Sequence, residues 1–532
     1  MSRLVAIARL AVACIVVQCI LVWPDRLDAV EWNAFLSPQI ELAIVIGAIA
    51  LAARPGSTGL WPMLIRRALT AFLAVLLVLR LADMVMNAAF GRPFDLVLDL
   101  HLIGKGSNFV ADSLGLAIGL ALCIGLAFAL IIIIFAIDRA MGEIGAATLR
   151  LGRFRPVAAV LLLAGGGIAI ANQPDPVLAK SSSALTAHLA RAYQSATDLE
   201  SFAAEAAEQP LGHLLPSRRL QGLAGKDVIF IFIESYGAST LSDASFKPAI
   251  SHTLDEAQRA IAQKGYGVRS AFLTSTTIGG QSWLAQSALM SGLRIDNQGR
   301  YDAFVRQGGP NLVRDFSSAG WHTAAIAPAI TQPWPEARSF GFDTVLTAAD
   351  LGYRGQPFSW VTMPDQFTLS AFEKRVRSQQ LGPVMAQITL ISSHAPWTPL
   401  PQLVSWDALG DGTVFNAMAK AGEPAESLWR DHDRVRLQYR RAIEYSLTAI
   451  ADYVRHYGSK DLVLILVGDH PPAPWIAGSA AREVPIHILA ADPDVLTALD
   501  DWHWTHSMRP GPEAPVWPMA AFRERFVKAF SG

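Results

Sequence analysis

The chain has 532 residues, of which 52% are apolar and only 17% are charged, and its formal net charge is −1. A chain of this length can form more than one domain, and its near-neutral charge argues against nucleic acid as a partner. The apolar excess lies in the first 172 residues, so we expect a membrane domain ahead of a soluble one.

Five apolar stretches near membrane-spanning length occur in this N-terminal region. They run from about Leu4 to Trp23, Ile40 to Ala53, Leu69 to Phe90, Leu114 to Ile137 and Pro156 to Ala171. We therefore predict a transmembrane domain of five helices at residues 1–172. The first stretch lacks a small-residue cleavage site and further spans follow it, so we interpret it as a retained helix and not as a signal peptide.

Basic residues between these stretches predict their orientation, because Lys and Arg are retained on the cytoplasmic side of a membrane. The N-terminus and the second and fourth connections carry Arg3, Arg54, Arg66, Arg67, Arg139, Arg150, Arg153 and Arg155. The first and third connections carry only Arg26, Arg92 and Lys105. We therefore expect a multi-pass protein of the inner (cytoplasmic) membrane, with the chain after about residue 172 in the periplasm.

The next segment, residues 173–225, is predicted to be a juxtamembrane helix and linker. It opens with a Pro- and Ser-rich joint, and apolar residues from Leu185 to Phe202 then follow at helical spacing. All three cysteines, Cys14, Cys19 and Cys123, lie in predicted spans. The part outside the membrane therefore has no disulfide and must depend on an ordinary hydrophobic core.

The pattern changes at Lys226, where the predicted catalytic domain, residues 226–532, begins. Short apolar runs rich in β-branched residues alternate with helical stretches. The runs are "KDVIFIFIESYG", "HTAAIAPA", "PVMAQITLISSH", "DLVLILVGDHPP" and "VPIHILA". This alternation predicts an α/β domain with a buried, mostly parallel central sheet.

Three of these runs end in chemically active side chains, namely Glu234, His394 and the pair Asp469 and His470. Ligands of open α/β sheets bind at the carboxyl ends of the strands, so these residues are expected to converge. Carboxylates with an imidazole suit a divalent metal such as Zn or Mn. Alternatively, Asp469 caps the next helix and His470 lies on the surface. Glu234 favours the metal, because a carboxylate after a buried strand is costly unless it is paired or metal-bound.

A possible nucleophile lies in the stretch "TSTTIGGQSWLAQSALMSG". Gly279 and Gly280 allow a tight bend, and the following run has helical character up to Gly292, so Ser282 is expected to be the N-cap of a helix. A hydroxyl at a helix start suits an anionic phosphate or sulfate. Ser282 could also be a simple cap, and Thr276 and Thr277 are the alternative hydroxyls.

Together these motifs resemble the alkaline phosphatase superfamily, in its sulfatase-like, membrane-anchored branch. "IESYG" is similar to the motif of the branch's first metal carboxylate, "VGDH" to its Asp-His ligand pair and "SSHAPW" to the motif of its substrate-side His. "GGQSW" is similar to its nucleophile loop, in which the nucleophile, often Thr, follows a Gly. The resemblance covers roughly residues 226–490 and implies an alkaline phosphatase/sulfatase-like fold with Glu234, Ser282, Asp469 and His470 on the metal.

The five-span anchor is also similar to lipoteichoic acid synthases and to phosphoglycerol and phosphoethanolamine transferases. In the synthases a Trp and an Arg near a "fGyD" element bind glycerol phosphate, which implies that role for Trp334 and Arg338 in "PWPEARSFGFD". "TMPDQF" resembles the "kDe" element of the branch and implies that Asp365 contacts the substrate, together with His394. Leu284 and Gln286 stand where formylglycine sulfatases carry Pro and Arg, so that activity is not expected.

The expected activity is transfer of a phospholipid-derived headgroup, phosphoglycerol or phosphoethanolamine, to a periplasmic glycan or lipid acceptor. Ser282, activated by one divalent ion (Mn, Mg or Zn), would form a covalent intermediate, and His394 would hold the phosphate or protonate the leaving group. The lack of cysteines outside the membrane favours phosphoglycerol. The alternatives are a sulfatase-like phosphodiesterase or other hydrolase, and a membrane pseudoenzyme that serves as a scaffold.

Overall fold

The computed structural model describes residues 2–26, 35, 39–53, 60–100, 102, 116–172, 180–208, 211–212, 214 and 218–531. Arg54, Lys105, the start of the fourth predicted span and the joint at residues 173–179 lie outside this part of the chain. The chain divides into two compact units, one of residues 1–88 and 92–197, and one of residues 89–91 and 198–532. The division falls inside one long helix, α8 (Lys180–Ala207).

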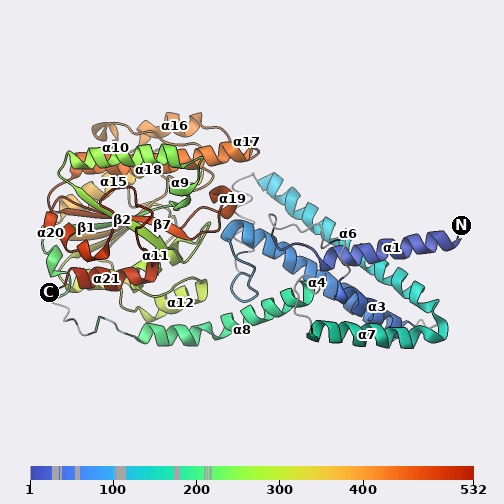
Figure 1. Ribbon diagram of the computed structural model, residues 1–532. Helices are drawn as coiled ribbons and strands as arrows, with labels where there is room; N and C mark the ends of the chain where they lie inside the picture. Colours follow the sequence, from blue (N-terminus) through green and yellow to red (C-terminus); the bar gives the residue numbers. More distant parts are fainter. Residues whose placement is uncertain are drawn as a thin grey trace. The chain divides into compact units, whose positions relative to one another are not determined.

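The first unit is helical (Figure 1). Besides α8 it contains α1 (Ser2–Leu21), α3 (Ile40–Ala52), α4 (Leu60–Phe90), α6 (Leu116–Leu149) and α7 (Arg155–Asn172). Three stretches within the described residues are long and apolar enough to cross a membrane, Leu4–Leu21, Leu60–Phe90 and Gly119–Leu149. The helix α3 is apolar but only 13 residues long. Five spans are therefore not confirmed, whereas three helices have the length and apolar composition of membrane spans.

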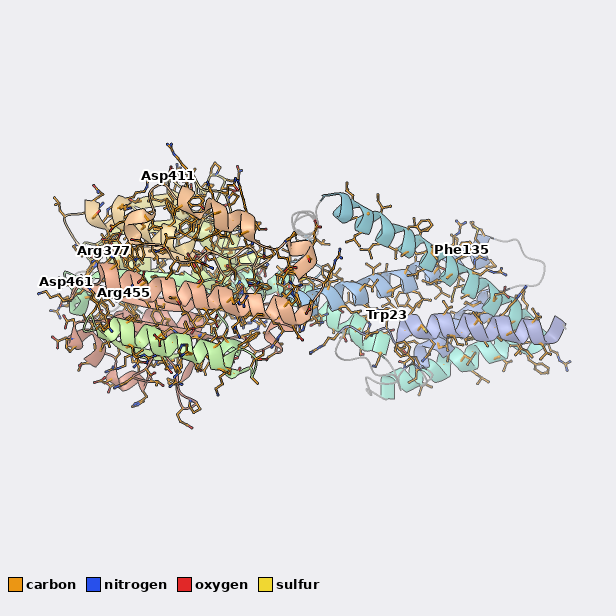
Figure 2. The ribbon with its side chains drawn as sticks, turned by 90° about the horizontal axis from the view of Figure 1, so that it is seen from above. Trp23, Phe135, Arg377, Asp411, Arg455 and Asp461 are labelled. Atoms are coloured by element: carbon orange, nitrogen blue, oxygen red, sulfur yellow. The ribbon has the colours of Figure 1, made fainter. Side chains whose placement is uncertain are left out.

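Apolar side chains cover much of the outside of this unit, as expected where lipid replaces water. Phe135 on α6 is 71% exposed and projects from the helix (Figure 2). Gly47 lets α3 and α7 approach each other closely. A Cβ atom at this position would lie only 3.1 Å from the carbonyl oxygen of Ala159 on α7. Polar contacts join α4 to α8: Arg80 donates to the carbonyl oxygen of Lys180 at 2.7 Å, and Nε2 of His188 lies 3.0 Å from Asp83, where both side chains are buried.

The second unit is built on a sheet of eight strands in the order β4-β3-β5-β1-β6-β7-β2-β8. All neighbouring strands are parallel except where β7 pairs with β6 and β2. The strands are β1 (Asp227–Ile233), β2 (Gly267–Thr274), β3 (His322–Ala327), β4 (Thr344–Thr347), β5 (Val384–Leu390), β6 (Leu462–Gly468), β7 (Glu483–Ala490) and β8 (Val516–Pro518). The five predicted apolar runs are β1, β3, β5, β6 and β7, whereas β2, β4 and β8 were not predicted.

Helices cover both faces of this sheet (Figure 1). One face carries α10 (Lys247–Ala262), α15 (Asp365–Arg375) and α18 (His432–Tyr457), and the other carries α11 (Ser282–Ser291), α12 (Gln298–Gln307), α13 (Leu312–Ser318) and α21 (Phe522–Ala529). Alternate residues of β1 point to the two layers, Ile229 and Ile231 to the first and Phe230 and Phe232 to the second. Each of these buried side chains contributes about 2 kcal/mol of hydrophobic free energy, which explains the unbroken apolar run.

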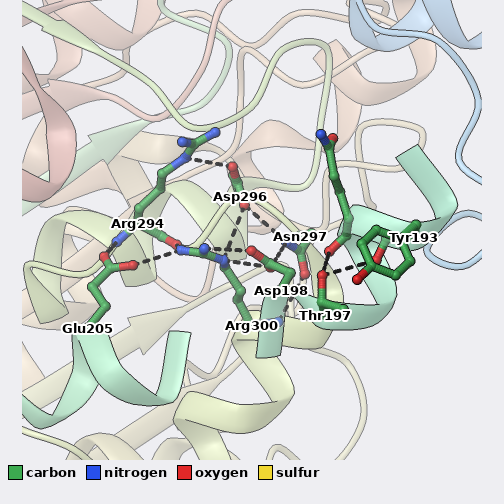
Figure 3. A network of polar contacts seen from close by, with 9 residues as sticks. Tyr193, Thr197, Asp198, Glu205, Arg294, Asp296, Asn297 and Arg300 are labelled. Atoms are coloured by element: carbon green, nitrogen blue, oxygen red, sulfur yellow. Dashed lines mark hydrogen bonds and ion pairs between the residues drawn. The ribbon is translucent and has the colours of Figure 1, made fainter. Parts of the chain in front are cut away.

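The end of α8 is tied to this unit by Arg300 of α12 (Figure 3). The Arg300 guanidinium donates to both carboxylate oxygens of Asp198, at 2.6 and 2.7 Å, and to Glu205 at 2.9 Å. Its side chain is only 8% exposed. The hydrogen bonds to Asp198 raise the pKa of Arg300, despite its partial burial, and the same bonds lower the pKa of Asp198. Bidentate pairing of this kind fixes geometry as well as charge.

Candidate active site

Three adjacent strands end at the candidate site. In the sheet β1 lies between β5 and β6, and Ile233, its last residue, is in register with Leu390 of β5 and Gly468 of β6. Glu234 follows β1 directly, Asp469 and His470 follow β6 directly, and His394 lies four positions beyond β5. Because the three strands are parallel, the predicted convergence of these residues at one edge of the sheet is present.

The ends of β1 and β6 approach each other closely. A Cβ atom on Gly468 would lie 2.0 Å from the carbonyl oxygen of Tyr236, so only glycine fits at this position. Oδ1 of Asp469 accepts the main-chain N–H of Ser235 at 2.9 Å and that of His470 at 2.7 Å. Glycine is therefore required at position 468 by lack of space and not by an unusual φ angle.

Glu234, Asp469 and His470 form a compact group of possible metal ligands. Each offers one ligand atom, and these atoms lie within 4.8 Å of one another. The residues are 4%, 0% and 1% exposed, respectively. Nδ1 of His470 lies 2.8 Å from the carbonyl oxygen of Pro471, a contact that leaves Nε2 directed at Glu234, 3.2 Å from Oε1. The second carboxylate oxygen of Asp469 is buried and has no hydrogen-bond partner within the described residues.

The charges of this group favour the binding of a cation. Burial, followed by the nearby charge of Glu234, raises the pKa of Asp469 to about 7. Burial opposes a charge on His470 as well, but the neighbouring carboxylates outweigh it and raise the pKa of the imidazole to about 9. The pKa of Glu234 is lowered despite its burial, because His470 lies beside it. Two carboxylates, an imidazole and an unpartnered oxygen fit a divalent cation.

Ser282 reaches this group from α11. It is the first residue of the helix and not the predicted N-cap, because Gln281 precedes it in the left-handed conformation at φ 62°. Gly279 and Gly280 have φ angles of 70° and 149°, which favour glycine, so the loop turns sharply just before the helix. The prediction that Gly292 ends the helix is correct.

The Ser282 hydroxyl points at the possible metal ligands instead of capping the helix. Its oxygen donates to Oε2 of Glu234 at 3.0 Å and lies 3.1 Å from Nε2 of His470. The hydroxyl groups of Thr276 and Thr277 have no hydrogen-bond partner within the described residues and contact neither Glu234 nor His470 by hydrogen bonding. Of the three hydroxyls considered from the sequence, Ser282 alone bonds to the ligand group.

Two serines that were not singled out from the sequence support Glu234 and Asp469 by bonding to the main-chain carbonyl oxygens of these two residues. Ser275, just beyond β2, donates from Oγ to the carbonyl oxygen of Asp469 at 2.6 Å. Ser393 donates in the same way to the carbonyl oxygen of Glu234, also at 2.6 Å. Both serines are buried. Their position just beyond a strand is the sequence feature that could have indicated this role. Other serines beyond strands share that feature, so the sequence does not distinguish these two.

His394 is half-buried, and its ring makes a hydrogen bond and a stacking contact. Nδ1 lies 2.6 Å from the carbonyl oxygen of Ala395. A carbonyl can only accept, so Nδ1 carries the hydrogen and Nε2 is the nitrogen left for chemistry. The indole of Trp360 stacks on the imidazole, with ring centroids 4.0 Å apart and planes inclined by 19°.

Asp365 takes a different place from the predicted substrate contact. It is the first residue of α15 and is completely buried. Its carboxylate accepts the N–H groups of Ile391 and Ser392 at 2.9 Å and the hydroxyl of Ser446 at 2.6 Å. These bonds hold the segment that leads from β5 to His394, so Asp365 stabilises the position of His394 from within the protein core.

Trp334 and Arg338 lie beyond the end of β3, at the same edge of the sheet as Glu234. Trp334 is partly buried, and its ring lies 6.5 Å from that of Phe340. Arg338 belongs to the short helix α14 (Ala337–Phe340) and is exposed. Neither side chain is hydrogen-bonded to the ligand group, so the structure does not join them to it directly.

Comparisons with known proteins find no matching family model and no matching curated protein. The chain does resemble solved structures. With the phosphoethanolamine transferase EptA of Neisseria meningitidis it shares 12% identity over 98% of this chain and 95% of that one, at a TM-score of 0.47. The lipoteichoic acid synthase LtaP of Listeria monocytogenes is 15% identical, with coverages of 57% and 71% and a TM-score of 0.37.

A third structure, the phosphoglycerol transferase GacH of Streptococcus pyogenes in complex with sn-glycerol-1-phosphate, shares 12% identity over 62% of this chain and 91% of that one, at a TM-score of 0.37. These are the kinds of protein that the sequence motifs resemble.

Proposed function

We propose that the chain is a membrane-anchored, metal-dependent transferase that moves a phospho-headgroup from a phospholipid to a glycan or lipid acceptor. The observation that carries this proposal is the Ser282 hydroxyl, hydrogen-bonded to both Glu234 and His470 within the buried ligand group. A hydroxyl held among metal-binding side chains suits nucleophilic attack on phosphorus, so the reaction would pass through a covalent phosphoseryl intermediate.

One divalent cation, Mn, Mg or Zn, would be held by Glu234, Asp469 and His470, with Ser282 as a further ligand. The unpartnered oxygen of Asp469 supports this, because a buried carboxylate oxygen needs a partner. When bound, the cation would lower the pKa of the Ser282 hydroxyl and offset negative charge on the phosphate.

The remaining work falls to side chains of the chain itself. As the oxygen of Ser282 bonds to phosphorus, its proton has an acceptor 3.0 Å away, Oε2 of Glu234. The bond from phosphorus to the leaving alcohol breaks, and Nε2 of His394 gives that oxygen its proton. The neutral His394 then takes a proton from the acceptor hydroxyl as that hydroxyl displaces Ser282. In this second step the bond between Ser282 and phosphorus breaks, and the Ser282 oxygen takes back the proton held by Glu234, so both side chains return to their starting state.

Trp334 and Arg338 are proposed to bind the headgroup. An exposed guanidinium suits a phosphate oxygen, and an indole beside it can cover the carbon atoms of glycerol or ethanolamine. Asp365 would act only indirectly, through the segment of His394. Phosphoglycerol and phosphoethanolamine both fit these contacts.

The donor is proposed from the membrane anchor. Five crossings, with the N-terminus in the cytoplasm and the catalytic unit in the periplasm, would explain the distribution of arginines along the first 172 residues. An enzyme tethered beside the outer leaflet has phospholipid headgroups at high local concentration. Water could replace the acceptor, in which case the enzyme would be a phosphodiesterase that uses the same intermediate.

The test is detection of the intermediate. Purified full-length protein in detergent is loaded with Mn²⁺, mixed with phosphatidylglycerol or phosphatidylethanolamine, quenched in acid and analysed by mass spectrometry. The tryptic peptide from Ser270 to Arg294 contains four serines besides Ser282, so fragment ions must locate the adduct. We expect a phosphoglyceryl or phosphoethanolamine group on Ser282, and its mass names the donor. An adduct on another residue, or turnover without any adduct, would refute the covalent route.

A further inference from the structure

Trp360 has no part in the steps above, yet it stacks on His394 with a specific geometry. The ring centroids are 4.0 Å apart and the planes are nearly parallel. The indole remains 44% exposed, so it is not simply a core residue. The two residues come from separate segments, one before α15 and the other after β5.

A tight turn presents the Trp360 indole. Phe358 and Val361 exchange two main-chain hydrogen bonds, at 2.8 and 3.1 Å, and Ser359 between them adopts the left-handed conformation at φ 59°. A non-glycine residue in this conformation costs about 1 kcal/mol. Phe358 and Val361 are 1% and 4% exposed and belong to the core beside α18. The turn is thus anchored on both sides, and Trp360 extends from a fixed base.

The main chain at His394 is equally well fixed, but its ring is not. Asp365 holds the main chain of Ile391 and Ser392, and Ser393 bonds to the carbonyl oxygen of Glu234. Among the residues that the structure describes, the imidazole itself has one hydrogen bond, from Nδ1 to Ala395. A single bond leaves the ring free to rotate about it, whereas a stacked indole selects one plane. Trp360 is therefore the contact that decides where Nε2 points.

We propose that Trp360 is a positioning residue that holds the His394 ring so that Nε2 faces the leaving oxygen of an aliphatic alcohol. This role rests on the proposed function, in which His394 is the proton donor. As the bond between Ser282 and phosphorus forms and the bond to the alcohol breaks, the proton on Nε2 passes to the alcohol oxygen and leaves a neutral imidazole. An aliphatic alkoxide leaves poorly without that proton, whereas a nitrophenolate leaves well without it.

The substrate class follows from this geometry. A ring fixed for proton donation benefits donors whose leaving group is an aliphatic alcohol, as diacylglycerol is in a phospholipid. It gives little benefit to aryl esters. Sensitivity to the leaving group therefore separates a positioning role of Trp360 from a purely structural one.

The experiment compares two donors that share the transferred headgroup and differ only in the leaving group. One is the phospholipid identified by the Ser282 adduct, in mixed micelles, and the other is the p-nitrophenyl ester of the same headgroup. With the phospholipid, Trp360→Ala should lower kcat about 10- to 100-fold, part of the usual contribution of a proton donor. With the nitrophenyl ester the loss should stay below about 3-fold, because no proton is needed. KM should change little with either donor, and Trp360→Phe should recover most of the lost kcat.

A matched control is Trp475→Ala. Trp475 is 38% exposed, close to the value for Trp360, but its ring packs on Trp429 and His432 and not on His394. Trp475→Ala should leave unchanged the ratio of kcat with the phospholipid to kcat with the nitrophenyl ester. Should Trp360→Ala not fold, as judged by metal content and thermal midpoint, Trp360→Leu takes its place under the same criteria, because leucine fills space without a π face.

Equal losses of kcat with both donors, or a rise in KM alone, would overturn the positioning role and make Trp360 a structural or binding residue. His394→Ala should show the same leaving-group sensitivity as Trp360→Ala. If His394→Ala affects both donors equally while the Ser282 adduct still forms, the proton-donor role is wrong and the covalent route survives. Absence of the adduct is a separate failure, that of the proposed function.

Discussion

The hydroxyl oxygen of Ser282 lies 3.1 Å from Nε2 of His470, although 188 positions separate the two residues in the sequence. The same hydroxyl donates to Glu234, which comes from a third segment. Three elements, β1, β6 and α11, thus meet at one oxygen atom, and each can be tested by a substitution that leaves the others in place.

Ser282→Ala should reduce turnover by about 1,000-fold or more, since a covalent route has no substitute for the missing oxygen. Metal content, measured by mass spectrometry of the elements, should stay unchanged because Glu234, Asp469 and His470 remain. Ser282→Thr keeps a hydroxyl and should retain part of the activity. Thr277→Ala is the control and should be mild. If Thr277→Ala is inactive and Ser282→Ala is active, the nucleophile lies in the preceding loop and is not Ser282.

Asp469→Asn should remove the bound metal and the activity while the protein stays folded. The amide oxygen of Asn can still accept the N–H groups of Ser235 and His470, so the local shape is kept and only the charge is lost. Asp461→Asn is the matched control, because that carboxylate pairs with Lys226 and is 47% exposed. Chelation should abolish the activity of the unaltered protein. Full metal occupancy in Asp469→Asn would remove Asp469 from the ligand set.

The effect of metal on stability should depend on pH. In the metal-free protein the pKa of Asp469 is raised to about 7 and that of His470 to about 9, so the folded state binds more protons than the unfolded state. The stabilisation from protonated His470 is complete below its unfolded pKa of 6.5 and is lost as the pH rises to about 9. The contribution of Asp469 to stability changes with pH in the same direction, because its stabilising protonation is lost between pH 3.8 and about pH 7.

Metal requires the ionised Asp469 and the neutral His470, so protons compete with it. The rise in thermal midpoint that Mn²⁺ causes should therefore grow from about pH 6 to about pH 9, as measured by calorimetry of the solubilised protein. Taking the difference with and without metal cancels the titration of groups far from the site. Asp469→Asn should show little rise at any pH. A rise that is the same across this range would contradict the pKa shifts.

The orientation of the chain can be tested with reporter fusions. A reporter that is active only outside the cytoplasm should work when fused after Ser183, in α8, and fail when fused after Gly145, in α6. A reporter that is active only in the cytoplasm should give the opposite result. The expectation rests on the arginine-rich connection between α6 and α7, which should stay inside. Activity of the first reporter after Gly145 alone would reverse the topology.

The sequence was sufficient for the strands that carry the ligands and insufficient for much around them. Runs such as that of β1 are buried on both faces and therefore unbroken, which is why their ends and Glu234 could be located. In contrast, β2 alternates between buried and partly exposed residues, and β4 is only four residues long, so neither gives a strong signal. Strand ends at the edge of a parallel sheet converge by geometry, and this made the grouping of Glu234, Asp469 and His470 predictable.

Details that depend on side-chain direction were not predictable. Ser282 was expected to cap α11, but Gln281 occupies that position in a left-handed conformation that local sequence does not reveal. Asp365 was expected to face the substrate, and its burial depends on Ile391, Ser392 and Ser446, far away in the chain. The stacking of Trp360 on His394 arises from packing between two loops, which no residue pattern encodes.

The position of β1 between β5 and β6 also determines how the site should open. Glu234, Asp469 and His470 each follow one of the strands in the middle of an eight-stranded sheet, where main-chain amides are bonded on both sides. Amide hydrogens of such strands exchange with solvent only through the largest unfolding events, whereas edge strands and termini exchange through small ones. The amides of Ile231, Ile233 and Leu466 should therefore be among the slowest to exchange in the chain, and the ligand group should persist while β4 and β8 fray.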